Sequence, residues 1–355
     1  MNPNPEPNPD GELDPDLREA MARLVRQAGL RGEPCLIALA GGANNRVFRV
    51  EAGGDLALLK IYFRHPGDPR DRLGAEFGFC SFAWGHGVKC LPQPLACDRG
   101  ASLALYEYLP GKRVQPGEVS AEALRQAVAF YRAVNRHRDT RAARALPEGS
   151  EACFSMAAHL ACVDRRVRRL AGLQSGAVVA EAERFVREEL VPRWEQVANP
   201  RCDRAGEQAL SEADRRLSPS DFGFHNALRG PDGCLRFFDF EYAGWDDPAK
   251  LVCDFFCQPA VPVPLECWEE FAGAVAEDLA EPARQRARFA ALLPVYRVKW
   301  CCILLNDFLP EGSARRRFAH GPVALAEQRE RQLEKARDML RRLDGDTRTQ
   351  GASTP

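Results

Sequence analysis

The character of the sequence changes at Pro110-Gly111. Upstream, short β-favouring runs alternate with glycine-containing turns, and one helical stretch covers about residues 69–85. Downstream, apolar residues recur at helical spacing in long segments. We therefore predict an α+β fold of two lobes. A small antiparallel sheet carrying one helix is expected at residues 16–110, and a mainly helical lobe at residues 111–343.

The hydrophobic pattern also locates the individual elements. In the first lobe a helix is expected from Asp16, followed by strands at residues 35–40, 47–50, 56–63 and 102–108. In the second lobe helices are expected at residues 120–136, 152–170, 178–190, 265–279, 284–308 and 323–343. A loop and a strand at residues 217–243 interrupt them. Residues 1–15 and 344–355 are polar and are predicted to be disordered tails.

Composition excludes several classes of protein. The net charge of −1 argues against nucleic acid or an anionic membrane surface as a partner. The N-terminus lacks a secretory signal, and Arg297 and Lys299 interrupt the most apolar late segment, so we expect a cytoplasmic protein with no membrane span. The thirteen cysteines show no zinc-ligand spacing and are interpreted as buried thiols. The run Arg315-Arg316-Arg317 is interpreted as a solvated loop, because no aromatic residues are interleaved with it, and contact with phosphates is the alternative. The oligomeric state stays open.

The segment 217–228, LSPSDFGFHNAL, contains two competing kinase motifs. If Asp221-Phe222-Gly223 were the magnesium motif of a protein kinase, a catalytic Asp with Asn at the fifth following position should lie upstream. None of the candidates Asp164, Asp203 and Asp214 has that Asn. If Asp221 is instead the catalytic aspartate, Asn226 has the required spacing, and Asp239 follows on the strand candidate 234–240. We therefore interpret the Asp-Phe-Gly triplet as a coincidence.

Candidate nucleotide-binding residues lie upstream of the lobe boundary. Gly41, Gly42 and Asn45 lie between two strand candidates, where glycine lets the backbone approach an anion and Asn offers amide donors. A plain hairpin turn explains the glycine pair at least as well. Lys60 ends an apolar run, and a buried, unpaired ammonium is costly, so an anionic partner such as Glu76 is expected. Snorkelling from an edge strand is the alternative.

Taken together, these residues resemble the aminoglycoside phosphotransferase and choline kinase-like family. The resemblance extends from about residue 35 to 310, and its most specific parts are the Asp221/Asn226 pair and the run Asp239-Phe240-Glu241-Tyr242-Ala243. It implies a bilobal protein-kinase-like fold that binds ATP and Mg²⁺ between its lobes and phosphorylates a hydroxyl of a small molecule.

The resemblance also implies a role for each matching residue. Lys60 would hold the phosphates, and Glu76 would hold Lys60 in place. Backbone groups of Glu107, Tyr108 and Leu109 would bind the nucleobase. Asp221 would orient or deprotonate the acceptor hydroxyl, and Asn226 and Asp239 would bind magnesium. Two departures from the family pattern stand out: Pro219 replaces the usual His, and the catalytic loop reads Gly223-Phe224-His225.

The acceptor is predicted from the acidic and aromatic residues that follow Asp239. Glu241, Trp245, Asp246 and Asp254 suit an ammonium group through charge pairing and cation–π contact. An amino sugar, an aminocyclitol or an amino alcohol is therefore the expected acceptor. The alternative is that these acids hold the loop in place through hydrogen bonds.

Two functions follow from this set of residues. The first is a small-molecule kinase. The second is a kinase-fold protein of weak activity that binds nucleotide in a regulatory or scaffold role. The presence of Lys60, Asp221, Asn226 and Asp239 together favours the kinase. A protein kinase is disfavoured because no Ala-Pro-Glu motif follows Asp239.

Overall fold

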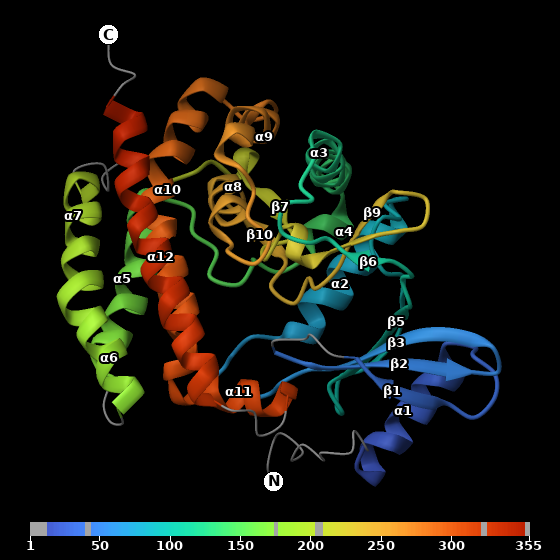
Figure 1. The fold of residues 1–355 in the computed structure, drawn as a ribbon. Helices are drawn as coiled ribbons and strands as arrows, with labels where there is room; N and C mark the ends of the chain where they lie inside the picture. Colours follow the sequence, from blue (N-terminus) through green and yellow to red (C-terminus); the bar gives the residue numbers. More distant parts are fainter. Residues whose placement is uncertain (1–12, 40–43, 174–176, 203–208, 321–324, 352–355) are drawn as a thin grey trace.

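The computed structural model describes residues 13–39, 44–173, 177–202, 209–320 and 325–351, and it has two lobes (Figure 1). The N-terminal lobe contains a five-stranded antiparallel sheet of order β1-β2-β3-β5-β4. Its strands are β1 (Cys35–Ala38), β2 (Arg46–Ala52), β3 (Asp55–Ile61), β4 (Pro94–Asp98) and β5 (Leu103–Glu107). The register places Lys60 of the central strand β3 between Val47 and Ala104.

Two helices accompany this sheet. Helix α1 (Pro15–Gln27) is capped by Asp14, whose carboxylate accepts the Leu17 N–H, and its apolar face joins the core formed with the sheet. Helix α2 (Arg72–Gly85) packs against β4 and β5 and carries Glu76 toward the cleft. Strand β4 was not predicted. It lies at the edge of the sheet and begins with a proline, which weakens its strand pattern.

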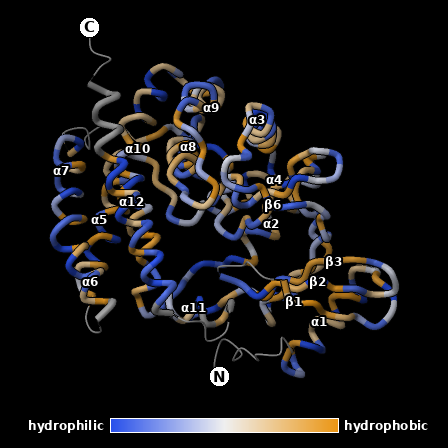
Figure 2. The backbone as a smooth tube through the Cα atoms, viewed as in Figure 1, coloured by the Kyte–Doolittle hydropathy of each residue, from blue (hydrophilic) through white to orange (hydrophobic). Residues whose placement is uncertain are grey.

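The C-terminal lobe is mainly helical. Figure 2 shows hydrophobic residues along the strands of the N-terminal sheet and many hydrophilic residues along the outer helices α7 and α12. The helices are α3 (Ala121–Asn135), α4 (Arg141–Arg144), α5 (Met156–Ala171), α6 (Ala177–Phe185), α7 (Val191–Cys202), α8 (Pro248–Cys257), α9 (Trp268–Ala276), α10 (Pro282–Leu304), α11 (Pro310–His320) and α12 (Leu325–Gly351). A π-helical turn at Val186–Leu190 joins α6 to α7.

Two small antiparallel sheets interrupt these helices and hold the predicted catalytic loop. One pairs β7 (Arg216–Ser218) with β10 (Gly244–Asp246). The other has the order β6-β8-β9 and is formed by β6 (Lys112–Arg113), β8 (Ala227–Arg229) and β9 (Leu235–Phe237). Since β5 belongs to the first sheet and β6 pairs within the second lobe, the change of lobe falls between residues 107 and 112.

One helical segment, Pro282–Phe308, is long and apolar enough to cross a membrane, but 78% of its apolar window is buried inside the protein. Packing in the core therefore explains its hydrophobicity. The thirteen cysteines are all free thiols, and seven of them are buried. Buried thiols were thus the right interpretation for most of them.

Two expectations for the C-terminal part were wrong. The run Arg315-Arg316-Arg317 lies in helix α11, where Phe318 packs on Phe63 with ring centroids 5.5 Å apart, and is not a loop. The predicted tail from residue 344 continues helix α12 as far as Gly351. Extending an established helix adds one hydrogen bond for each residue fixed, so polar composition alone does not end it.

Gly244 is expected to tolerate no side chain. A Cβ at this position would lie 2.4 Å from the Pro147 carbonyl oxygen and 2.6 Å from the Gly149 nitrogen, both backbone atoms. Gly244→Ala should therefore destabilise the fold by about 1–3 kcal/mol, the usual cost of overpacking. Gly273→Ala is the control, because a Cβ there meets nothing within 4 Å and alanine is worth about 1 kcal/mol in a helix. Urea denaturation that finds Gly244→Ala as stable as the parent would contradict this packing.

Candidate active site

A cavity of about 300 Å³ lies between the lobes, where a nucleotide is expected. Its apolar walls include Val47, Leu58, Leu228 and Phe238. It brings together eight predicted residues from both lobes: Asn45, Lys60, Glu76, Glu107, Tyr108, Leu109, Asn226 and Asp239. The loop glycines Gly41 and Gly42 lie outside the described residues.

Lys60 connects the two lobes through a pair of carboxylates. Its ammonium donates to Glu76 Oε2 at 2.7 Å and to Asp239 Oδ1 at 2.5 Å, and the residue is only 6% exposed. Glu76 comes from α2 of the N-terminal lobe, while Asp239 follows β9 of the C-terminal lobe. The lysine is therefore the buried, paired cation that the sequence predicted, and snorkelling does not describe it.

Glu76 is held by further hydrogen bonds. Tyr62 donates its hydroxyl to Glu76 Oε2 at 2.7 Å, and the Phe240 N–H donates to Oε1 at 3.2 Å. The Tyr62 hydroxyl also contacts that of Tyr106 at 2.8 Å. Both oxygens of Glu76 are thus used, so the carboxylate has one defined position from which to hold Lys60.

Negative charge is in excess around Lys60. Burial raises the pKa of Asp239 to about 6; Lys60 opposes that rise, and the charges of Glu241 and Glu76 add to it. Burial alone would lower the pKa of Lys60, but Asp239 and Glu76 outweigh it and raise that pKa. Lys60 therefore stays charged, while Asp239 is the carboxyl that most needs an additional cation.

The catalytic loop holds Asp221 through its neighbours. The His225 ring contacts Asp221 Oδ1 at 3.2 Å, and the Asn226 amide donates to the Asp221 carbonyl at 3.0 Å. Burial alone would raise the pKa of Asp221, but the charge and hydrogen bond of His225, with Asn226, hold it below its ordinary value. Asp221 is therefore a carboxylate at neutral pH, and His225 supports the loop from within.

Backbone conformation and aromatic packing hold both aspartates. Ser220 and Asp239 have φ angles of 69° and 70°, in the left-handed region that non-glycine residues seldom adopt. The Phe130 ring of α3 lies 5.6 Å from that of Phe222 and 5.9 Å from that of Phe240, centroid to centroid. Phe222 is the middle residue of the Asp-Phe-Gly triplet. Its role here is to anchor the catalytic loop in the core.

Asn226 and Asp239 form a donor set that fits magnesium. Mg²⁺ prefers oxygen ligands, and in phosphoryl-transfer sites one or two protein ligands suffice because phosphates and water supply the rest. The Asn226 nitrogen is turned toward Asp221, and within the described ranges its side-chain oxygen receives no hydrogen bond. No group of three or more His, Cys, Asp or Glu suited to a metal occurs in that part of the chain. The fit is therefore to a metal shared with a phosphate.

Glu241 contacts the loop that was predicted to cover the nucleotide. Its two oxygens accept hydrogen bonds from the side-chain amides of Asn44 and Asn45, each at 2.6 Å. Asn45 also accepts the Phe63 N–H at 3.2 Å. Asn45 and Glu241 were assigned to the nucleotide and to the acceptor, but their polar groups bind each other across the lobes.

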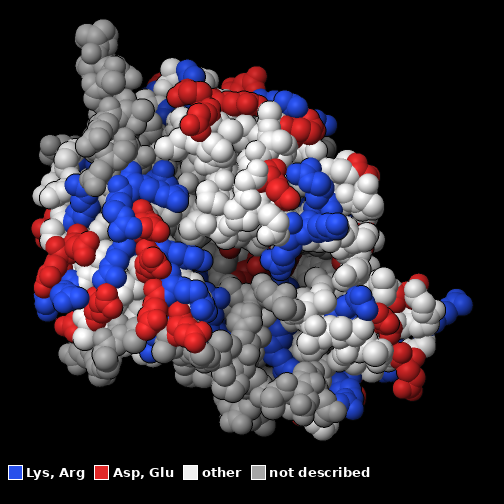
Figure 3. Space-filling model, viewed as in Figure 1, with Lys and Arg blue, Asp and Glu red and all other residues white. Residues whose placement is uncertain are grey.

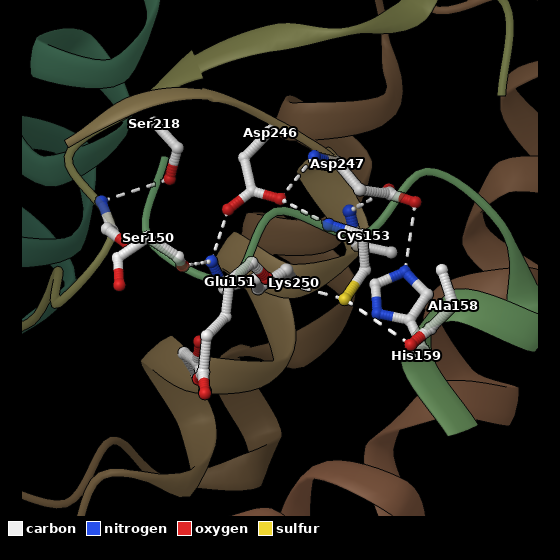
Figure 4. Close-up of polar contacts among 12 residues, drawn as sticks. Ser150, Glu151, Cys153, Ala158, His159, Ser218, Asp246, Asp247 and Lys250 are labelled. Atoms are coloured by element: carbon white, nitrogen blue, oxygen red, sulfur yellow. Dashed lines mark hydrogen bonds and ion pairs between the residues drawn. The ribbon is translucent and has the colours of Figure 1, made fainter. Parts of the chain in front are cut away.

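The other residues predicted to bind the acceptor are occupied by structural contacts. Asp246 pairs with Lys250 inside the protein, as Figure 4 shows, and also accepts the N–H of Asp247. Asp254 pairs with Lys299 at 2.9 Å, and the Trp245 indole donates to the Ala143 carbonyl. None of Trp245, Asp246 and Asp254 lines the nucleotide cavity. Their positions support the alternative role of holding the loop and do not support an ammonium site.

The raised pKa of Asp239 predicts how stability depends on pH in the metal-free protein. A folded-state pKa of about 6 exceeds the ordinary value of 3.8, so the folded protein binds the extra proton between these values. Stability must therefore fall as pH rises through that window, and the loss is complete above about 6. Asp239→Asn removes this loss, so its stability relative to the parent should increase from pH 5 to pH 7.5.

Urea denaturation with a chelator present at both pH values measures this effect. Asp55→Asn, which removes an exposed carboxylate of β3, is the control. A relative stability of Asp239→Asn that does not change with pH would contradict the raised pKa.

The comparisons with known proteins agree with this geometry. The model of the phosphotransferase enzyme family matches residues 36–290. A sequence search of curated proteins found no match. Among solved structures, the fold is similar to spectinomycin phosphotransferase in complex with ADP and spectinomycin, at 11% identity and a TM-score of 0.55, covering 89% of this chain and 98% of that one.

Two choline kinases have similar folds. The enzyme from Streptococcus pneumoniae has 11% identity and a TM-score of 0.54, covering 92% of this chain and 99% of its own. The enzyme from Cryptosporidium parvum has 10% identity and a TM-score of 0.52, covering 92% and 97%. These likenesses confirm the predicted bilobal protein-kinase-like fold. With the family model covering well over half of its length, the chain belongs to the phosphotransferase enzyme family and is a small-molecule kinase.

Proposed function

We propose that this protein transfers the γ-phosphoryl group of ATP, with Mg²⁺, to a hydroxyl of a small molecule. The observation that carries the proposal is Lys60, which links Glu76 of one lobe to Asp239 of the other inside the cavity between them. Such a lysine can contact nucleotide phosphates while its carboxylate partners keep it charged and in place. ATP is abundant in the cytoplasm, so a cytoplasmic location belongs to the same proposal.

The nucleotide would occupy the 300 Å³ cavity. Its base would lie between the apolar walls, with hydrogen bonds to backbone groups of Glu107, Tyr108 and Leu109, which line the cavity. Its phosphates would extend toward Lys60 and the Asp239 carboxylate. The solved spectinomycin phosphotransferase of similar fold is in complex with ADP, which supports a nucleotide as a ligand of this fold.

Asn226 and Asp239 would hold the magnesium ion, which would neutralise charge on the β- and γ-phosphates during transfer. Asp221 would accept a hydrogen bond from the acceptor hydroxyl. This bond would orient the hydroxyl oxygen toward the γ-phosphorus. Because the pKa of Asp221 is lowered, this carboxylate is a weak base, and orientation of the hydroxyl is its main contribution. His225 and Asn226 keep it in that orientation.

The alternative of a weakly active nucleotide-binding protein is less well supported. A degenerate site commonly loses a polar residue, whereas here Lys60, Asp221, Asn226 and Asp239 are all present and three of them line one cavity. Pro219 stands where the family usually has a His. In this chain the ring of His225 contacts Asp221 instead, from within the loop. The amino-bearing acceptor stays a prediction of the sequence.

The two aspartates should differ in their effects. Asp221→Asn is expected to keep Mg-ATP affinity but to reduce phosphoryl transfer by about 10²–10⁴-fold, the range for a positioned acid or base. Asp239→Asn should weaken Mg-ATP binding as well, because a metal ligand acts in both the ground and transition states. Calorimetry and ADP release with each variant test this assignment. Loss of metal-dependent binding in Asp221→Asn, with normal binding in Asp239→Asn, would reverse it.

Gly223→Ala should disturb Asp221 through His225. A Cβ at residue 223 would lie 2.8 Å from His225 Nδ1, so the ring must turn away from Asp221. We expect roughly a 10-fold lower kcat, as from an off-rotamer side chain, with unchanged Mg-ATP affinity. In a double-mutant cycle, adding Gly223→Ala to His225→Ala should then lower kcat little further. Additive effects on kcat would show that Gly223 acts independently of the histidine.

A further inference from the structure

A second cavity between the lobes, of about 670 Å³, is large enough for a small-molecule acceptor. Its walls come from the β3–α2 connection, the segment 148–151, helix α5, and the end of α10 with α11. In Figure 3, Lys and Arg side chains border the central hollow and acidic side chains lie within it. The inference below rests on the proposed function and concerns the chemical class of the acceptor.

One wall of this cavity is attached to the catalytic loop. The Gly149 N–H donates to the Trp245 carbonyl at 2.9 Å, and the Ser150 N–H donates to the Tyr242 carbonyl at 3.0 Å. Trp245 lies in β10, which pairs with β7, and Asp221 lies in the segment that follows β7. This wall is thus connected through β10 and β7 to the segment that carries Asp221.

The carboxylates of this cavity are mostly neutralised already. Asp68 pairs with Arg70 at 2.5 Å, Glu151 with Arg166 at 2.5 Å, and Glu311 with Arg169 at 2.7 Å. Glu148, an exposed residue of the wall, is the one acid lining it that pairs with no cation in the described part of the chain. Little free negative charge is therefore available for an ammonium group.

Arg315, unlike these paired carboxylates, is a charged residue of the cavity with no partner of opposite charge in the described part of the chain. It lines the cavity from α11 and is half-buried, and among the described residues it makes no hydrogen bond or ion pair, with its Nε atom fully enclosed. The contact between Phe318 and Phe63 holds α11 against the N-terminal lobe. Burial lowers the pKa of Arg315; Tyr242 opposes this, and the charges of Arg72 and Arg70 add to it.

Arg72 and Arg70 add to the positive charge near Arg315. Arg72 is only 2% exposed, shares Asp68 with Arg70 through a 2.5 Å contact, and leaves two enclosed nitrogens without partners among the described residues. Both guanidinium groups lie over the Tyr242 ring, at 5.4 Å for Arg70 and 5.6 Å for Arg72. Tyr242 follows Glu241 in the Asp-Phe-Glu-Tyr run, so these arginines adjoin the metal-binding end of the site.

We infer that the acceptor carries an anionic oxygen group, a carboxylate or a phosphate, and that Arg315 binds it beside Arg70 and Arg72. A half-buried guanidinium with an enclosed, unpaired Nε is costly, and its planar donors match these two groups better than any others. The acceptor's hydroxyl then points toward Asp221. This assignment replaces the ammonium group predicted from Trp245, Asp246 and Asp254, whose polar atoms are used elsewhere.

Matched acceptors test the class directly. Acceptor-dependent ADP release is measured with glucosamine, glucose, glucuronate and glucose 6-phosphate, and with ethanolamine, ethylene glycol and glycolate. The anionic members of each set should have the highest kcat/KM. Comparing glucose 6-phosphate with glucuronate distinguishes a phosphate group from a carboxylate. An amino or neutral compound as the best acceptor would overturn the inference and leave the proposed function standing.

Substitution of the arginine provides the second test. Arg315→Gln should raise the KM of the anionic acceptor at least about 10-fold and leave kcat and the KM for ATP within about 2-fold, because a charge-assisted contact to the bound group is lost. Arg331→Gln, the same change at a 57% exposed side chain of α12, is the control. An increase in the KM for ATP with Arg315→Gln would place this residue at the nucleotide and overturn the inference.

Binding without turnover separates the two proposals. With Mg²⁺ and a non-hydrolysable ATP analogue present, calorimetry measures the affinity for glucuronate and for inorganic phosphate in the parent and in both variants. Anion binding that needs Arg315 supports the site even where ADP release fails with every compound, and only the proposed function is then lost. No anion binding together with no anionic substrate would refute the site.

Discussion

The buried ammonium of Lys60 is the constraint on which the arrangement of the two lobes depends. At 6% exposure it cannot rely on water, and an unpaired buried charge is far more costly than a paired one. Its partners come from helix α2 and from the segment after β9, so neutralising one lysine requires that the lobes meet at this point. Glu76 lines the cavity, and the hydrogen bonds that it accepts from Tyr62 and from the Phe240 backbone fix its carboxylate there.

The same constraint leaves the site short of positive charge. Glu76, Asp239 and Glu241 surround one lysine. Burial raises the pKa of Asp239, Lys60 opposes that rise, and the charges of Glu241 and Glu76 add to it. Burial alone would raise the pKa of Glu241. The charges of Lys60 and Arg72 and the hydrogen bond from the Asn45 amide outweigh burial and lower it. A fold optimised only for stability would not gather three carboxylates here. The unfavourable charge is understandable if a divalent cation completes the site during function.

Sequence reasoning could propose catalytic residues because their signal is local. Asp221 and Asn226 lie within one loop, and Asp239 follows a nearby strand, so spacing alone is enough to propose them. The ion-pair partners of the acidic residues were harder to predict from the sequence. Asp254 pairs with Lys299, a residue 45 positions away, and no pattern in the sequence joins them. Asp246 and Lys250, in contrast, are four positions apart at the start of α8, and that spacing was a usable sign of an ion pair. The role of Arg315 depends on the packing of α11 against the N-terminal lobe, which only the tertiary structure shows.

The two cavities differ in electrostatic character in a way that suits transfer to an anionic acceptor. An acceptor with a carboxylate or phosphate approaches the negatively charged γ-phosphate of the nucleotide, and the two groups repel each other. The proposed Mg²⁺ and Lys60 would reduce the charge on the nucleotide side, but they would not screen the acceptor's own anion. Arginines on the acceptor side remove that second source of repulsion, and burial makes them more effective because the local dielectric is low. Arg70 and Arg72 cannot do this alone, since both are tied to Asp68. Arg315 pairs with no carboxylate in the described part of the chain, so its charge is available to the ligand, and this makes it the residue through which the proposed site selects its substrate.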